Sequence, residues 1–414
     1  MNRVFYGWVI TASAFAVLFL TYGVQYSFGI FVPAMVAELG WPRAALGAAF
    51  SLYGVVYMSV TVISGHLTDT RGPRRVVTVG GLLLGAGIVA TSQVTTQWQL
   101  FLSYGIVAAL GMSTAYIPCN MTVVRWFRRR RGLAAGLASS GSSCGILTMP
   151  IVVYALISFT DWRTAMLWCG AGLCLLTVIA ASFFVTEPAA VGLTVDGDPT
   201  DDDVAAPPDA CCGAAVIGAA PGWTLAAARG TASLWLFVLA FAVALITMTI
   251  PFVHVPGFAG DLGLSELTGA GSVSMIGLFA LLGGVSLGAL ADRIGHRRAM
   301  LMGLGAQVIA YVALYCAHGV GLLLFGAALF GIFYGSFVAL FPALVADLFG
   351  LGHAGTIGGF IVGGGGLLGA WGPAAAGYLR DADGDFRRVF VLCAVTAVVA
   401  LILVATLPRP RRGA

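Results

Sequence analysis

Long apolar stretches alternate with short polar segments along almost the whole chain. Uncharged apolar runs of about 20 residues, enough to cross a bilayer as a helix, recur twelve times. In lipid a run of this length forms a helix because the helix satisfies its own backbone hydrogen bonds. The pattern predicts an all-α membrane protein with twelve transmembrane helices, over residues 7–32, 44–68, 75–95, 98–124, 132–157, 164–185, 232–256, 266–291, 299–317, 320–346, 354–379 and 389–408.

One long polar stretch interrupts this pattern in the middle of the chain. Residues 187–230 are rich in Ala, Pro, Gly and Asp and contain too few apolar side chains to form a core. We therefore expect three parts: an N-terminal six-helix half over 1–186, a linker over 187–230, and a C-terminal six-helix half over 231–414.

The two halves repeat each other at a fixed offset of 223 residues. Gly65, Asp69 and Gly72 correspond to Gly288, Asp292 and Gly295, and the register still holds downstream, where Gly132 and Gly136 match Gly355 and Gly359. Two intensely apolar halves with the same internal pattern are typical of a duplicated transporter whose binding site lies between them. The sequence thus predicts pseudo-symmetric halves.

Composition and charge support a protein dissolved in lipid. Hydrophobic residues make up 59% of the 414 positions, charged residues only 9%, and the mean hydropathy is +0.96. If the N-terminus is cytoplasmic, 16 of the 21 basic residues, all of them Arg, lie in segments on the cytoplasmic side. The positive-inside rule then predicts that both termini are cytoplasmic in a multi-pass protein of the inner or plasma membrane. The net charge of +4 therefore reports topology and does not require nucleic acid as a partner.

A charged motif follows the second apolar span of each half. Both copies fit G-x-L-x-D-x-x-G-x-R-R, with an acidic side chain at a helix end and arginines that can pair with it. We interpret these residues as a conformational latch that holds one side of the bundle closed; ordinary positive-inside placement of arginine is the simpler alternative. The latch residues are Asp69, Arg74, Arg75, Asp292, Arg297 and Arg298, and Asp347 after the tenth span is assigned to the same latch.

This duplicated motif resembles the hallmark of the major facilitator superfamily, and the resemblance covers essentially the whole chain. Three segments also resemble the monocarboxylate-transporter branch and its bacterial relatives, which include oxalate–formate antiporter-like proteins. They are Tyr6-Gly7-Trp8, residues 125–134, and residues 252–256, and Asp347-Leu348-Phe349-Gly350 also fits. The resemblance implies the twelve-helix major facilitator fold and transport of a small organic acid.

One position departs from that branch, which usually carries an Arg midway along its eighth helix. Gly284 stands at the aligned position, and every Arg of this chain lies in a loop or at a helix end. An unpaired carboxylate in a dehydrated cavity costs several kcal/mol. Gly284 would leave extra room there, and a neutral, zwitterionic or protonated substrate becomes the alternative to a carboxylate.

Candidate cavity residues are polar or aromatic side chains at mid-depth in the predicted helices. Polar groups at membrane depth usually face an interior or a cavity, although a single Ser often bonds back to its own helix. The substrate-binding candidates are Tyr22, Gln25, Tyr26, Tyr116, Asn120, Ser139, Ser140, Ser143, His254, Tyr334 and Phe337.

His254 is the titratable candidate for proton coupling. It lies within the seventh predicted span, between Pro251 and Pro256, which are expected to unwind the helix. The unperturbed imidazole pKa of about 6.5 suits reversible protonation, whereas the alternative role is to cap carbonyls freed by the prolines. The remaining histidines, His66, His296, His318 and His353, lie at predicted helix ends or in loops and are expected to be solvated.

The chain carries no nucleotide-binding loop and no cysteine or histidine spacing that suits a metal, so we expect no enzyme activity, no metal and no cofactor. The prediction is a monomeric secondary transporter that moves a monocarboxylate or related organic acid with a proton by rocker-switch alternating access. Export of a neutral or amphipathic compound is the first alternative. A receptor that binds without transporting is the second, and the short linker offers no signalling domain for it.

Overall fold

A computed structural model describes residues 5–197, 222–369, 372, 375–376, 378–379 and 386–408. Almost all of the regular structure in these residues is helical. The segments are α1 (Tyr6–Tyr26), α2 (Phe28–Leu39), α3 (Arg43–Arg71), α4 (Pro73–Thr91), α5 (Gln97–Leu100), the π-helix η1 (Phe101–Ala108), α6 (Ala109–Met112), α7 (Tyr116–Trp126), α8 (Arg131–Phe159), α9 (Trp162–Ser182), the short 3-10 turns η2 (Pro188–Val191) and η3 (Val195–Gly197), α10 (Leu225–Arg229), α11 (Ala232–Met248), α12 (Ile250–Asp261), α13 (Glu266–Ile294), α14 (His296–Tyr315), α15 (Val320–Phe349), α16 (Ala354–Gly369) and α18 (Arg387–Thr406).

Eleven helical stretches within the described residues are long and apolar enough to cross a membrane. A twelfth apolar helix, Ala354–Gly369, is shorter and corresponds to the beginning of the predicted span 354–379, the rest of which lies largely outside the described residues. Each predicted span therefore has a helical counterpart in the structure.

Three of the spans are interrupted. The first breaks at Ser27, whose hydroxyl donates to the carbonyl oxygen of Gly23 (2.7 Å), before the chain continues as α2. The fourth passes through the π-helix and a turn that precedes Tyr116. The seventh breaks at Thr249, so that α12 begins one residue before Pro251, where the missing proline N–H costs no helical hydrogen bond. Pro256, in contrast, lies inside helical α12.

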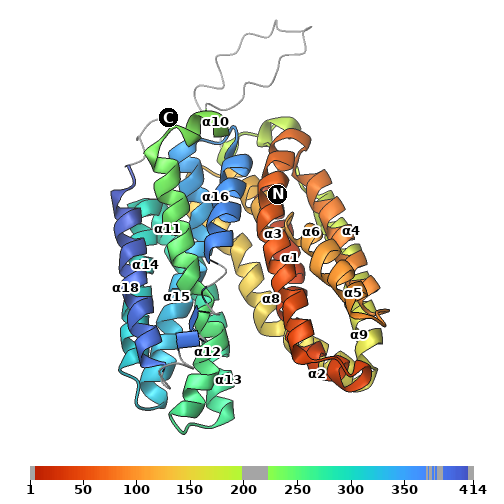
Figure 1. Ribbon diagram of the computed structural model, residues 1–414. Helices are drawn as coiled ribbons and strands as arrows, with labels where there is room; N and C mark the ends of the chain where they lie inside the picture. Colours follow the sequence, from red (N-terminus) through yellow and green to blue (C-terminus); the bar gives the residue numbers. More distant parts are fainter. Residues whose placement is uncertain are drawn as a thin grey trace, which may run out of the picture.

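The helices form two bundles that lie side by side, one from residues before the linker and one from residues after it (Figure 1). Each bundle has its own core of buried apolar side chains, one built from residues of the first half and one mainly from the second. Contacts between the halves are made chiefly by α8 with α13 and α15, and by α3 with α16. Part of α7 crosses this boundary, because Tyr116, Ile117 and Met121 belong to the core of the second half.

One end of the molecule carries the beginning of α1, the end of α18 and helix α10 (Figure 1). We call it the linker end and the opposite one the far end. Near each end of the linker, one residue forms hydrogen bonds with the half that it adjoins. The carboxylate of Asp196 accepts hydrogen bonds from the backbone N–H groups of Arg128 and Arg129, and the N–H of Trp223 donates to the carbonyl of Phe349 (2.9 Å).

Candidate functional site

Glycines bring the halves into backbone contact at the linker end. On α8, a side chain at Gly132 or Gly136 would collide with the carbonyl oxygen of Gly288 or Gly284 on α13. On α3, one at Gly65 would collide with the carbonyl of Gly355 on α16. Close approach of this kind lets helices associate in lipid through dispersion between backbones. These two seams, α8–α13 and α3–α16, are related by the internal repeat.

The helices of the α8–α13 seam separate toward the far end. On α13, a Cβ added at Gly277 would meet only the side chain of Leu147, at 3.9 Å. Backbone contact between the halves is therefore concentrated at the linker end.

Asp69 joins the two halves across the α3–α16 seam. Its carboxylate accepts hydrogen bonds from the N–H groups of Gly355 (3.2 Å) and Thr356 (2.6 Å) and from the Thr356 hydroxyl (2.7 Å), all at the first turn of α16. Within its own half, Arg125 pairs with it at 2.7 Å, and the two side chains are only 3% and 7% exposed. A carboxylate at a helix N-terminus satisfies free N–H groups and faces the positive end of the helix dipole.

Asp292 makes the repeat-related contact across the α8–α13 seam. Its carboxylate accepts from the N–H groups of Gly132 (2.6 Å) and Leu133 (3.0 Å) at the first turn of α8. The same seam holds a second carboxylate, Asp347 of α15, which pairs with Arg131 (3.0 Å) and with Nδ1 of His296 (2.6 Å). Asp347 thus lies at the linker-end contact, where the sequence analysis places it.

The arginines of the motif take other positions. Arg74, Arg75 and Arg298 are exposed, and Arg297 donates to the carbonyl oxygens of Val404 (3.2 Å) and Ala405 on α18. The guanidinium groups that pair with the seam carboxylates belong to Arg125 and Arg131 instead. These two residues were not predicted as partners, although both stand in the basic segment 125–131.

His296 contradicts its predicted solvation. The side chain is only 11% exposed, because Asp347 and Asp292 lie on either side of it. The prediction placed it correctly at a helix end, but that helix end lies inside the contact between the halves. The sequence offered one signal, which is that His296 directly follows Gly295 within the repeated motif. The other copy of the motif has Pro73 at that position.

Tyrosines from both halves meet at mid-depth. Tyr57, at the midpoint of α3, lies with its hydroxyl 3.2 Å from that of Tyr22. The hydroxyls of Tyr26 and Tyr334 interact across the halves, Tyr334 being at the midpoint of α15, and that of Tyr116 donates to the carbonyl of Val338 (2.6 Å). We call these five residues, Tyr22, Tyr26, Tyr57, Tyr116 and Tyr334, the tyrosine cluster.

Phe252 of α12 completes the aromatic surface of the cluster. Its ring centroid lies 5.1 Å from that of Tyr334 and 6.5 Å from that of Tyr26. The cluster therefore offers hydroxyl groups and ring faces, and none of its members carries a charge at neutral pH. Four of the five tyrosines were predicted from sequence, whereas Tyr57 and Phe252 were not, since an isolated aromatic residue in an apolar span gives no sign of which way it faces.

The other predicted cavity residues lie elsewhere or bond locally. Asn120 is completely buried, donates to the carbonyl of Tyr116 (3.1 Å) and accepts from Ser139 (2.7 Å), so it ties α7 to α8 within the first half. Ser140 donates to its own helix at Leu137, and Ser143 is buried. Phe337 packs against Phe241 and Phe333, each with centroids 5.5 Å away, in the core of the second half. The Oε1 atom of Gln25 is buried without a hydrogen-bond partner in the described structure.

His254 points away from the tyrosine cluster. Its ring lies 5.4 Å from that of Phe386, beside the start of α18. Residues two positions apart in a helix differ by about 200° around its axis. Phe252, which faces the cluster, and His254 therefore occupy opposite faces of α12.

Gly284 does not leave extra room, contrary to the expectation from sequence. A Cβ added there would lie 3.2 Å from the carbonyl oxygen of Gly335 on α15, and its own carbonyl meets Gly136. The position is part of the glycine contact of the seam, where α8, α13 and α15 approach one another closely.

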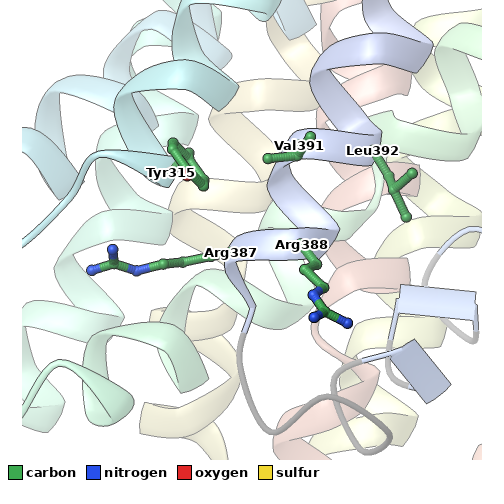
Figure 2. A pocket seen from close by; sticks show the side chains of 5 residues that line it. All are labelled: Tyr315, Arg387, Arg388, Val391 and Leu392. Atoms are coloured by element: carbon green, nitrogen blue, oxygen red, sulfur yellow. The ribbon is translucent and has the colours of Figure 1, made fainter.

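A surface pocket of about 400 Å³ lies at the far end of the second half, between the end of α14 and the start of α18. Figure 2 shows Arg387 and Arg388 leaving the first turn of α18 in different directions, with Tyr315 across from Val391. None of the predicted site residues lines this pocket, and it lies apart from the contact between the halves. It is therefore not a candidate for the transport site.

Comparison with known proteins agrees with this architecture. The sequence matches the Major Facilitator Superfamily over residues 14–318 and 274–414, which together span most of the chain. The chain belongs to this superfamily. Mouse monocarboxylate transporter 11 is 30% identical over 98% of this chain and 88% of its own length, and the human protein of the same name is 29% identical over 98% and 83%.

Solved structures of superfamily members share the fold at low sequence identity. The proton:xylose symporter XylE superposes with a TM-score of 0.74 at 14% identity, over 97% of this chain and 96% of its own. FucP in the outward conformation superposes with a TM-score of 0.72 at 12% identity, over 96% of this chain and 98% of its own. The predicted twelve-helix, all-α fold is thereby confirmed. The superfamily member described here is a multi-pass membrane transporter of the monocarboxylate-transporter-like branch, and not an enzyme.

Proposed function

We propose that this superfamily member carries a small monocarboxylate or related organic acid across the membrane together with a proton. The observation that supports this most directly is the uncharged tyrosine cluster between the halves at mid-depth. An organic acid that enters such a site as an anion loses hydration without gaining a counter-charge, at a cost of several kcal/mol. The acid and its proton together are neutral, and phenol hydroxyls can donate to and accept from a carboxyl group.

Transport proceeds in this proposal by rocker-switch alternating access, with the two halves turning about the tyrosine cluster. Two features support it: the cross-half contacts of Asp69 and Asp292 are concentrated at one end, and helices α8 and α13 separate toward the other. Opening of the linker end would require both carboxylates to leave the helix ends that they cap. The six latch residues of the sequence analysis then divide into two carboxylates that bind across the halves and four arginines at their margins.

The linker end is cytoplasmic in this proposal, and the protein acts as a monomer in the inner or plasma membrane. Support comes from the excess of arginine in the segments at this end. Labelling of a Thr70→Cys variant with a membrane-impermeant maleimide, after replacement of the native cysteines, checks the orientation. Reaction in intact cells, before permeabilisation, would reverse it.

His254 is the sequence-based candidate for the transported proton. To reach the cluster its ring must turn away from Phe386, and the helix break at Thr249 supplies a point at which α12 can reorient. The proposal assigns the proton to His254 in that rotated arrangement.

Uptake into proteoliposomes tests the function. Purified protein is reconstituted with a buffered interior, and radiolabelled monocarboxylates of increasing size are added outside at lower pH. We expect saturable accumulation that a protonophore abolishes and that protein-free liposomes lack. Accumulation unaffected by the protonophore would remove the proton from the proposal.

Export of a neutral or amphipathic compound is the second candidate, favoured by the absence of a cationic side chain among the tyrosine cluster residues. A thermal-shift screen with organic acids, amino acids and hydrophobic amines separates the two. Stabilisation by amines or neutral aromatics, with no monocarboxylate either binding or accumulating, would favour the second candidate over the first.

A further inference from the structure

The two linker-end seams differ in their charge balance. At the α3–α16 seam one carboxylate, Asp69, faces one guanidinium, Arg125. At the α8–α13 seam two carboxylates, Asp292 and Asp347, share a single guanidinium, Arg131. A group of partly buried charges that does not sum to zero is costly. A positive imidazolium at His296 would bring the second seam to the same neutral balance as the first.

The geometry around His296 fixes where its protons lie. Asp347 is paired with Arg131 through Oδ1, so it is ionised, and its Oδ2 lies 2.6 Å from Nδ1 of the imidazole. A carboxylate only accepts hydrogen bonds, and Nδ1 must therefore carry a hydrogen. The other nitrogen, Nε2, is buried without a hydrogen-bond partner and lies 3.8 Å from Oδ1 of Asp292. In a neutral ring the lone pair of Nε2 would point toward the Asp292 carboxylate, which is unfavourable. In a protonated ring an N–H group points toward it instead.

Three charged side chains of the described residues face the ring. From α13 it faces Asp292, from α15 Asp347, and from α8 Arg131, whose guanidinium is engaged by Asp347. On its own helix, Arg297 is engaged by the carbonyls of α18 and Arg298 is exposed, as is Arg293 at the end of α13. The balance at the ring is thus two carboxylates against one guanidinium.

We infer that the α8–α13 seam contains a proton-binding site, in which the imidazole of His296 holds a proton between Asp292 and Asp347 and thereby closes the linker end. The inference rests on the alternating-access part of the proposed function. Loss of the proton to water at the linker end leaves the seam with an uncompensated negative charge. Asp292 is then repelled from Asp347, and its hold on the first turn of α8 weakens.

The direction of the effect follows from this balance. Acidic solution populates the imidazolium and favours the closed linker end, and alkaline solution favours the open one. The α3–α16 seam contains Pro73 at the matching position and so provides no titratable counterpart. This proton controls the gate and is separate from the proton carried with the solute.

Distance measurements between spin labels test the inference without any solute. Labels are placed on cysteines at Thr70 of α3 and Met302 of α14, two exposed positions in different halves, after the 8 native cysteines are replaced. Pulsed electron resonance distances are recorded in detergent between about pH 5 and about pH 11, because the two carboxylates beside the ring shift imidazole titration to higher pH than usual. The wild-type background should shift from a short-distance to a long-distance population as pH rises.

Three variants complete the experiment. His296→Gln should lose the pH response, and His296→Arg, with a permanent positive charge, should keep the short distance at every pH. His66→Gln, which changes an exposed histidine at the same end, should titrate as the wild type does. A His296→Gln protein that still titrates like the wild type, or a wild type without a pH response, would overturn the inference. Failure to transport any monocarboxylate would leave these distances unaffected, so the two proposals fail separately.

Discussion

Asp69 and Asp292 cap helices of the opposite half at positions that are themselves related by the internal repeat. Asp69 accepts from the N–H groups of Gly355 and Thr356, and Asp292 from those of Gly132 and Leu133. Donor and acceptor positions are all shifted by the same 223 residues. The duplication has therefore preserved a reciprocal contact, in which each half closes on the other through the same bond.

Removal of either carboxylate should open the linker end. A capping contact of this kind is worth about 1–2 kcal/mol, so Asp69→Ala or Asp292→Ala should lower the ratio of closed to open protein by about 5- to 30-fold. The spin-label pair at Thr70 and Met302 measures this ratio. Asp161→Ala is the matched control, because Asp161 caps α9 within its own half through Thr164. Equal distance distributions in all three variants would refute the latch.

A single methyl group at Gly136 should have the same effect. An added Cβ collides with the backbone carbonyl of Gly284, so Gly136→Ala should drive the protein out of the state closed at the linker end. Gly172 on α9 has open space around it, and Gly172→Ala should raise thermal stability slightly, by about 0.5–1 kcal/mol, because alanine favours the helix. Identical shifts in melting temperature and label distance for the two variants would show that the seam tolerates the methyl group.

Hydroxyl groups of the tyrosine cluster should contribute to solute binding. Tyr116→Phe and Tyr334→Phe each remove one hydroxyl, and we expect a loss of about 0.5–1.5 kcal/mol, or about 2- to 12-fold in KM, for any monocarboxylate that is transported. Tyr104→Phe is the control, since the Tyr104 hydroxyl is buried without a partner in the core of the first half. Unchanged KM in both cluster variants would place the substrate elsewhere.

His254→Gln should abolish uptake driven by a pH gradient and leave the exchange of labelled for unlabelled solute intact. The reason is that glutamine retains hydrogen bonding but does not titrate near neutral pH. Uptake with and without a pH gradient in proteoliposomes measures the difference, and His318→Gln, an exposed position at the far end, serves as the control. Full coupling in the His254 variant would remove this residue from the proton pathway.

The sequence was sufficient for the fold because lipid imposes a simple rule. Apolar runs of bilayer length must be helices, and the repeat of Gly65 and Asp69 at Gly288 and Asp292 showed two similar halves. The family resemblance that these motifs carried is confirmed by the relatives. The break at Ser27 was not predicted, since an interruption of one residue leaves the hydropathy of a span unchanged. Unwinding of the seventh span was expected at Pro251 and Pro256, but the helix breaks at Thr249 and Pro256 lies inside α12.

Side-chain partners were much harder to predict from sequence. Arg125 and Arg131 pair with the seam carboxylates, and the arginines of the motif do not. This pairing depends on how helices from separate parts of the chain pack. Phe252 and His254 lie two residues apart, and the sequence indicates that they face opposite ways but not which one faces α1. His296 was assigned to solvent because the sequence did not reveal that Asp292 and Asp347 enclose its side chain.

The two fastened boundaries of the linker have a consequence for how the protein can be assembled. Asp196 holds the end of the first half to the segment before α8, and Trp223 holds the start of the second half to α15. Covalent continuity between them is thus not what aligns the seams. Co-expression of residues 1–197 and 222–414 as two polypeptides should yield a complex that copurifies and retains transport.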